Sequence, residues 1–215
     1  MTPSLIIFDC DGVVVDSEPM THQLLRDDLA THGLDMTVAQ VTQTFIGGTM
    51  SGVAAKARSL GAVLADDWVA QFYDRLYLRL AEGTALITGI PALLDRLDAR
   101  AVPYCIASNG RMAKMRITLG QHPDIWARLE GRLFSAEHVA APKPAPDLFE
   151  HAARSLGHAP GACVVIEDSA TGARAARAAG MRCYGYAPDG GGAYLAAEGA
   201  TPFHAMADLP ELLQL

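Results

Sequence analysis

The sequence predicts an α/β fold: a doubly wound parallel sheet that carries a separate, all-helical insert. Short, continuous apolar runs alternate with helical patterns, as expected when strands are buried on both faces of a parallel sheet. Between residues 18 and 82 this alternation stops, and only helical patterns remain. The chain of 215 residues, 50% of them hydrophobic, is long and apolar enough for such a core with a smaller insert.

Four apolar runs are predicted to be the strands of the sheet. The first covers residues 5–8 and is followed directly by Asp9. The others cover residues 102–107, 163–166 and, with a weaker pattern, 181–186. Helices are predicted at 89–100, at 147–156 and at 169–179; the second follows a proline and the third precedes a glycine, which favour a helix start and a helix end.

The insert is predicted to contain three helices, at residues 22–32, 51–60 and 66–81. The first two end at a glycine, and the third repeats apolar residues every four positions. We therefore expect residues 1–16 and 84–215 to form the core domain and residues 17–83 to form the helical insert.

Composition excludes several classes of protein. The net charge is −7 and there is no basic run, so no nucleic-acid partner is expected. No apolar stretch reaches membrane-spanning length, and the one before Asp9 is too short for a signal peptide; a cytoplasmic protein without a membrane partner is expected, with a monomer as the preferred state. The four cysteines are widely spaced and form no CxxC pair, so buried free thiols are expected.

Polar residues follow three of the predicted strands at the point where each strand ends. Ligands of an open parallel sheet bind at the carboxyl ends of its strands, so these residues are the candidates for a functional site. They are Asp9, Asp11 and Gly12 after the first run; Ser108, Asn109 and Gly110 after the second; and Glu167, Asp168 and Ser169 after the third. A separate loop places Lys143 between two prolines.

These residue types together indicate phosphoryl transfer. Carboxylates gathered at one sheet edge repel one another unless a cation such as Mg²⁺ lies among them. Ser108 with the following backbone amides forms an anion site, and Lys143 supplies a positive point charge. Asp9 can then attack phosphorus, while Asp11 protonates the leaving oxygen and later activates water. Each motif alone is equally or more typical of a turn or a helix cap, so the inference depends on the set.

With these motifs in this order, the sequence resembles the haloacid dehalogenase superfamily of phosphatases, in the group with a helical cap inserted after the first motif. The resemblance covers the whole chain and implies a Rossmann-like core with a mobile cap. It implies Asp9 as nucleophile, Asp11 as acid and base, Ser108 and Lys143 as phosphate-site residues, and Mg²⁺ as cofactor. It also implies that Mg²⁺ is held by Asp9, the Asp11 backbone carbonyl and Asp168, with Glu167 acting directly or through water.

The resemblance also suggests a substrate class, a small phosphorylated metabolite. The start of the chain and the residues around Ser108 are similar to a branch of sugar-acid-phosphate phosphatases typified by 6-phosphogluconate phosphatase. Asn109, Gly110 and Arg111 are candidate substrate contacts, as are Gly48 and Thr49 in the stretch that resembles the cap's specificity loop. Arg111 and Lys114 either meet a substrate carboxylate or lie on an exposed helical face, which is the more usual outcome.

Two alternatives remain open from the sequence. A phosphosugar mutase of the β-phosphoglucomutase type is weakened because Thr21 and Met50 stand where that enzyme has a cap histidine and an arginine. A receiver-like phospho-acceptor switch would also use an aspartate, a hydroxyl and a lysine around Mg²⁺. It is disfavoured because Asp11 can hydrolyse the phospho-aspartate and because a receiver lacks the insert.

Overall fold

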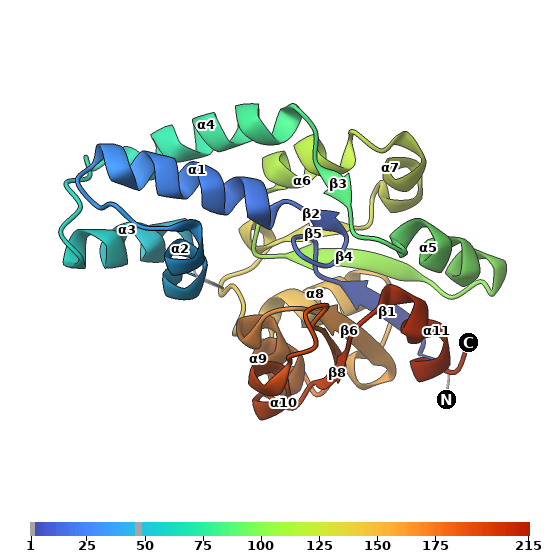
Figure 1. Cartoon of the computed structure of the whole chain (residues 1–215). Helices are drawn as coiled ribbons and strands as arrows, with labels where there is room; N and C mark the ends of the chain where they lie inside the picture. Colours follow the sequence, from blue (N-terminus) through green and yellow to red (C-terminus); the bar gives the residue numbers. More distant parts are fainter. Residues whose placement is uncertain (1–2, 46–48) are drawn as a thin grey trace. The chain divides into compact units, whose positions relative to one another are not determined.

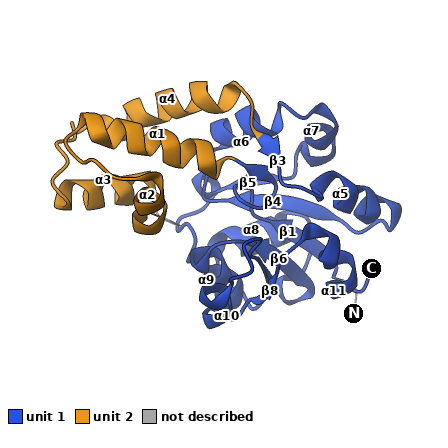
Figure 2. Ribbon diagram, in the orientation of Figure 1, with its two compact units in different colours: residues 1–16, 85–215 blue, residues 17–84 orange. Residues whose placement is uncertain are grey.

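The computed structural model describes residues 3–45 and 49–215. The chain forms two compact units: one comprises Met1–Asp16 and Ala85–Leu215, and the other comprises Ser17–Thr84 (Figure 2). The first unit contains the parallel sheet and its helices, and the second is built from helices (Figure 1).

The first unit is organised around a six-stranded parallel sheet with the order β5-β4-β1-β6-β7-β8. The strands are β1 (Leu5–Phe8), β4 (Tyr104–Ser108), β5 (Leu133–Ser135), β6 (Cys163–Glu167), β7 (Arg182–Tyr186) and β8 (Thr201–Phe203). The chain starts at β1, builds outward through β4 and β5, then returns to the other side of β1 and builds outward through β6 to β8. The switch point therefore lies beside β1, where ligands of doubly wound sheets bind.

The strand residues alternate between two hydrophobic clusters, one on each face of the sheet. On β1, Leu5 and Ile7 belong to the cluster that includes α8 (Asp147–Ser155), α9 (Ala170–Ala178) and α10 (Ala193–Ala197). Ile6 and Phe8 belong to the opposite cluster. That cluster includes α5 (Ile90–Ala99), α6 (Met112–Leu119), α7 (Pro123–Leu129) and α11 (Leu209–Leu212). Helices on both faces confirm the predicted doubly wound α/β fold (Figure 1).

A small antiparallel pair lies where the chain leaves and re-enters the first unit. Strand β2 (Val15–Asp16) pairs with β3 (Ala85–Leu86). Short 3-10 turns at Ala136–His138, Pro160–Ala162 and Met206–Asp208 complete the connections.

The second unit consists of α1 (Glu18–Thr31), α2 (Val38–Phe45), α3 (Met50–Ser59) and α4 (Trp68–Ala81). No strand occurs among its described residues, in agreement with the prediction from sequence, although α2 was not predicted. Helices α1 and α4 are joined through the Asp28 carboxylate. It accepts a hydrogen bond of 2.6 Å from the Trp68 indole Nε1 and pairs with the Arg75 guanidinium.

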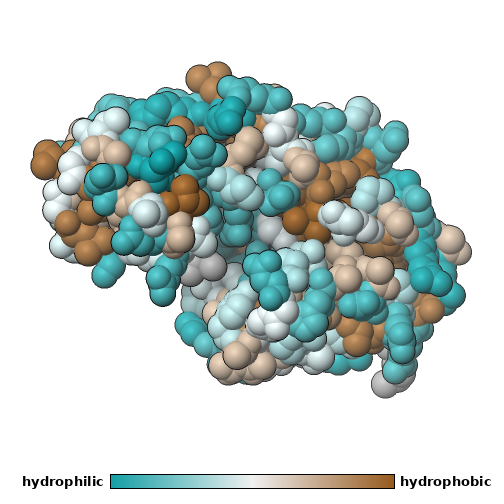
Figure 3. Space-filling model, in the orientation of Figure 1, coloured by the Kyte–Doolittle hydropathy of each residue, from teal (hydrophilic) through white to brown (hydrophobic). Residues whose placement is uncertain are grey.

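The cysteines and the surface agree with the composition. All four cysteines are buried and unpaired, which confirms the expectation of free thiols. The face drawn in Figure 3 is mainly hydrophilic, with apolar residues in smaller groups. Within the described part of the chain, every helix is too short or too polar to cross a membrane.

Candidate active site

Strand pairing brings the first and fourth motifs side by side. β1 and β6 are in parallel register, with Ile7 opposite Val165, and the ladder continues with a 2.9 Å hydrogen bond from the Asp9 amide to the Ile166 carbonyl. Because side chains alternate along a strand, Asp9 and Glu167 continue the rows of Ile7 and Val165, on the face covered by α8 and α9. Two carboxylates therefore lie next to each other at the sheet edge.

Lys143 joins these two carboxylates. Its Nζ lies 2.5 Å from Asp9 Oδ1 and 2.7 Å from Glu167 Oε1, and it stands 4.6 Å from the centre of the Phe149 ring. The lysine is only 4% exposed. Burial acts against its charge, but Asp9 and Glu167 outweigh that effect, so the pKa of Lys143 lies above its usual value. The lysine is thus a fixed cation beside Asp9.

The carboxylate of Asp9 lies in a crowded, acidic environment. Burial raises the pKa of Asp9 to about 7; Lys143 opposes this rise, and the charges of Glu167 and Asp11 add to it. Asp9, Asp11, Glu167 and Asp168 outnumber the two lysines, Lys143 and Lys114, that pair with members of this group. A further cation at this point would favour the ionised form of Asp9.

Glu167 is held on both of its oxygens. Oε1 accepts from Lys143, and Oε2 accepts hydrogen bonds of 3.0 Å from the Asp168 amide, 2.9 Å from the Ser169 amide and 2.8 Å from the Ser169 hydroxyl. A side-chain carbon at Gly172 would lie 1.8 Å from Glu167 Oε1, which explains the glycine in the first turn of α9. Glu167 therefore anchors Lys143 and the turn that follows β6.

Asp168 approaches the loop after β1. Gly12 has a φ of +76°, and a side-chain carbon there would lie 1.9 Å from Asp168 Oδ2. Glycine is thus required both by the backbone conformation and by the carboxylate packed against it. The hydroxyl of Tyr194 on α10 donates a 3.0 Å hydrogen bond to the Asp168 carbonyl, a contact that the sequence did not predict.

The oxygens near this loop fit Mg²⁺. The described residues contain no ready-made group of three or more His, Cys, Asp or Glu side chains arranged as metal ligands. Mg²⁺ does not need one, because it is usually bound by one or two carboxylates together with waters and substrate phosphate. Asp9, Asp168 and the Asp11 carbonyl supply hard oxygen donors of this kind, and the excess of carboxylates over lysines favours a cation.

The loop after β4 is held by hydrogen bonds from residues that the sequence did not predict. Ser108 ends β4, and its Oγ accepts a 3.0 Å hydrogen bond from the Gly110 amide. Ser135 Oγ on β5 donates to the Gly110 carbonyl at 2.7 Å, and Glu137 Oε2 accepts from the Met112 amide at 2.9 Å. Since α6 begins at Met112, residues 108–111 form a braced loop.

Lys114 differs from the expectation. Its ammonium lies 2.8 Å from Asp11 Oδ1, and the two side chains are only 13% and 20% exposed, so the favoured interpretation of an exposed helical face is wrong for Lys114.

Arg111 is exposed. The Asn109 side chain bonds the backbone of Lys143. Thr49 Oγ1 accepts from the Gly52 amide at the start of α3, and Gly48 lies outside the described residues.

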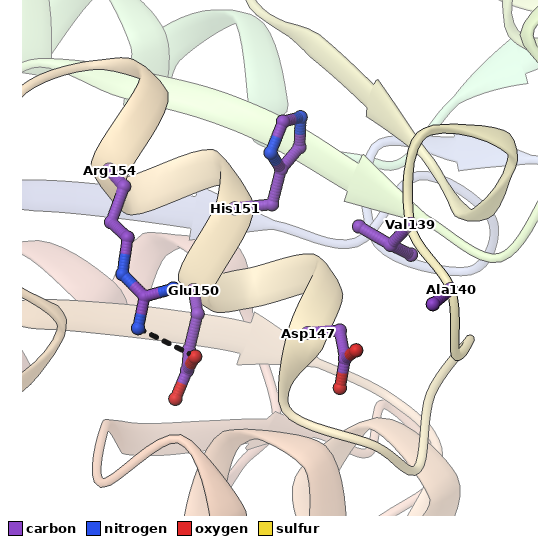
Figure 4. A pocket seen from close by; sticks show the side chains of 6 residues that line it. All are labelled: Val139, Ala140, Asp147, Glu150, His151 and Arg154. Carbon is purple, nitrogen blue, oxygen red and sulfur yellow. Dashed lines mark hydrogen bonds and ion pairs between the residues drawn. The ribbon is translucent and has the colours of Figure 1, made fainter.

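A cavity of about 310 Å³ lies along α8 (Figure 4). Its lining residues are Val139, Ala140, Asp147, Glu150, His151 and Arg154. Arg154 pairs with Glu150 at 2.8 Å. None of the residues that the sequence proposes for catalysis contributes to this lining.

Comparison with known proteins identifies the family. Residues 3–180 match the model of the haloacid dehalogenase-like hydrolases. The 6-phosphogluconate phosphatase of Escherichia coli K12 is 28% identical over 209 residues, covering 96% of this chain and 93% of the relative. Hexitol phosphatase A of the same organism is 32% identical over 181 residues, covering 81% and 78%.

A solved structure agrees over nearly the full length. A haloacid dehalogenase-like protein of unknown function from Agrobacterium tumefaciens matches with a TM-score of 0.87 and 32% identity, covering 98% of this chain and 97% of that one. The chain therefore belongs to the haloacid dehalogenase-like hydrolases and is a phosphatase of that family.

Proposed function

We propose that this phosphatase hydrolyses a small phosphorylated metabolite, a sugar phosphate or sugar-acid phosphate, with Mg²⁺ and through an aspartyl-phosphate on Asp9. The observation that carries the proposal is the buried Asp9 carboxylate, 2.5 Å from Lys143 Nζ at the carboxyl edge of the sheet. A carboxylate with a fixed cation, next to one strand that ends at Ser108 and another that is followed by Asp168, has the parts that phosphoryl transfer requires.

The first step is attack of an Asp9 oxygen on phosphorus. The P–O bond to the alcohol breaks, and Asp11 gives a proton to the departing oxygen. Lys143 offsets the negative charge that gathers between Asp9 and the phosphoryl group, and the Ser108 hydroxyl binds a phosphoryl oxygen.

The second step frees the enzyme. Asp11, now a carboxylate, takes a proton from water, which attacks the phosphorus of the aspartyl-phosphate. The P–O bond to Asp9 breaks, and inorganic phosphate leaves. Lys114 Nζ lies 2.8 Å from Asp11 Oδ1 and so holds this side chain in place.

We propose Asp9, the Asp11 carbonyl and Asp168 as the protein ligands of Mg²⁺. When bound, the ion neutralises charge on the carboxylates and the phosphoryl group. Glu167 is assigned a different role from direct ligation, because both of its oxygens already accept hydrogen bonds from protein groups. Its role is to hold Lys143 and the β6–α9 turn.

The substrate class rests on the relatives. Two of them are named for 6-phosphogluconate and hexitol phosphates, and both are at least 28% identical to this chain. We propose that the helical unit acts as the cap of this family and that Thr49 and Gly48 help to select the alcohol part of the substrate. Gly110 and Arg111 are the proposed contacts from the first unit.

The test is turnover of p-nitrophenyl phosphate with and without Mg²⁺, followed by a panel that includes 6-phosphogluconate and hexitol phosphates. Wild type is expected to require Mg²⁺, and Asp9→Asn to lose at least about 1,000-fold in kcat, because the nucleophile is removed. Asp147→Asn, a change of the same chemistry in the α8 cavity, serves as the matched control. Equal rates for wild type and Asp9→Asn would rule out the mechanism.

The panel also tests the mutase alternative. β-Glucose 1-phosphate is included, and the products are separated. Release of inorganic phosphate supports the hydrolase, whereas accumulation of glucose 6-phosphate supports the mutase. A phospho-aspartate that persists for minutes without phosphate release would favour the receiver-like switch.

A further inference from the structure

The side chain of Asn109 pairs with both backbone groups of Lys143. The Lys143 amide donates to Asn109 Oδ1 at 2.9 Å, and Asn109 Nδ2 donates to the Lys143 carbonyl at 3.1 Å. The two bonds run in opposite directions between one planar amide and one residue, in the manner of a strand pair. They fix the orientation of the Lys143 backbone as well as its distance from the loop after β4.

The prolines of the loop that carries Lys143 limit the backbone hydrogen bonds that can hold it. Pro142, Pro144 and Pro146 have no amide hydrogen, so they cannot donate to neighbouring elements. The Ala145 amide donates to the Pro142 carbonyl within the same loop. Asn109 thus supplies the link between this loop and the strand that ends at Ser108.

Asn109 is itself firmly placed, so it can act as an anchor. It directly follows β4, and the next residue is fixed by the 2.7 Å bond from Ser135 Oγ to the Gly110 carbonyl. Glu137 holds the Met112 amide at the start of α6. The anchor therefore belongs to the sheet, whereas Lys143 belongs to a loop.

We propose that Asn109 is a positioning residue for Lys143, in place of the direct substrate contact expected from sequence. It keeps the Lys143 ammonium beside the Asp9 carboxylate and connects Lys143 to the loop after β4, residues 108–111, so that the distance between the lysine and this loop stays constant during the reaction. The inference rests on the proposed function, in which Lys143 offsets charge between Asp9 and the phosphoryl group.

The effect of losing Asn109 follows from the geometry. Lys143 keeps its side-chain contacts with Glu167 at 2.7 Å and with Phe149, so the protein is expected to fold and the lysine to remain in the site. Its backbone becomes free to shift. A displacement of about 1 Å of a catalytic group can cost roughly 100-fold in rate, whereas substrate binding changes little if Asn109 makes no substrate contact.

The experiment compares Asn109→Ala and Asn109→Asp with wild type, using p-nitrophenyl phosphate with Mg²⁺. Asp keeps the acceptor for the Lys143 amide but replaces the donor with an oxygen facing the Lys143 carbonyl. We expect kcat to fall about 10- to 100-fold in both, with KM and the inhibition constant of inorganic phosphate within about threefold of wild type. Gln121→Ala, which removes a carboxamide bonded to the Ile117 carbonyl, is the control.

Two further measurements separate positioning from other roles. Amide hydrogen exchange at Lys143 is expected to be faster in Asn109→Ala, because its acceptor is lost. In a Lys143→Ala background, removal of Asn109 is expected to change kcat by less than about twofold, because residues that act through one another are not additive.

Three results would overturn the proposal: a raised KM and phosphate inhibition constant with unchanged kcat, unchanged exchange at Lys143, or the same fold loss with and without the lysine. The proposed function fails separately, if wild type is no more active than Asp9→Asn. The exchange measurement then still decides the role of Asn109.

Discussion

Replacing Glu167 by alanine is expected to destabilise the first unit more than any single surface change. Glu167 is 1% exposed and accepts hydrogen bonds from Lys143, from two backbone amides and from the Ser169 hydroxyl. Its removal leaves a buried ammonium with one carboxylate partner fewer and three neutral donors without their acceptor. Breaking a buried charge pair typically costs about 3–5 kcal/mol.

Glu167→Gln should cost less than Glu167→Ala. Glutamine keeps one acceptor oxygen and the volume of the side chain, so it can satisfy either Lys143 or the turn, but not both. We expect a loss of about 1–3 kcal/mol, the range for a hydrogen bond to a charged group. The matched control is Glu150→Ala, which removes the exposed Glu150–Arg154 pair at 2.8 Å and should cost less than about 1 kcal/mol.

Urea unfolding followed by tryptophan fluorescence measures these differences. The two tryptophans report on different units, since Trp126 lies in α7 and Trp68 in α4. A Trp68→Phe background therefore isolates the first unit. If Glu167→Ala unfolds within 1 kcal/mol of the Glu150→Ala control, the view of Glu167 as a structural anchor is incorrect.

Three other predictions concern Gly12, the buried thiols and Tyr104. Gly12→Ala places a side-chain carbon on Asp168 and should raise the Mg²⁺ concentration for half-maximal activity about tenfold or more, as measured by titration of metal-free enzyme. Burial raises the pKa of the Cys10 and Cys105 thiols, so the native protein at pH 8 should react slowly with Ellman's reagent. The denatured protein should show four reactive thiols. Rapid labelling of the native chain would contradict this expectation. Burial and the Asp98 hydrogen bond raise the pKa of Tyr104 to about 12, so the native state keeps a proton that the unfolded chain loses near pH 10. The free energy of unfolding should therefore fall between about pH 10 and 12. In urea titrations, Tyr104→Phe should make this fall with pH smaller.

The core of the site could be predicted because its residues are tied to strand ends. Continuous apolar runs reveal β1, β4 and β6, and the carboxyl ends of adjacent parallel strands must meet. The residues that follow them are therefore neighbours whatever the details of the connections. The sequence analysis did not identify β5 and β8 because three residues show no periodicity. It did not identify α2, which has only eight residues, although Thr37 and Gln40 form a capping box at its start.

Contacts that depend on the orientation of a helix relative to the sheet could not be predicted from the sequence. Lys114 reaches Asp11 only because α6 leaves the braced loop at a particular angle, and no local pattern encodes that angle. The same holds for Tyr194, which reaches Asp168 from a helix 26 residues further on. The two hydrogen bonds from the Asn109 side chain to Lys143 could not be predicted either. The sequence Ser-Asn-Gly is the same whether the asparagine amide faces a ligand or a neighbouring loop.

The central place of β1 has a consequence for synthesis of the chain. Lys143, the ion-pair partner of Asp9, is synthesised 134 residues after it. At translation rates of about 5–20 residues per second, roughly 7–27 seconds pass between the synthesis of Asp9 and that of Lys143. The helical unit is complete well before that. A chain interrupted before β6 lacks Glu167 and Asp168, so the group of residues proposed for catalysis is incomplete and such a product should be inert toward phosphate esters.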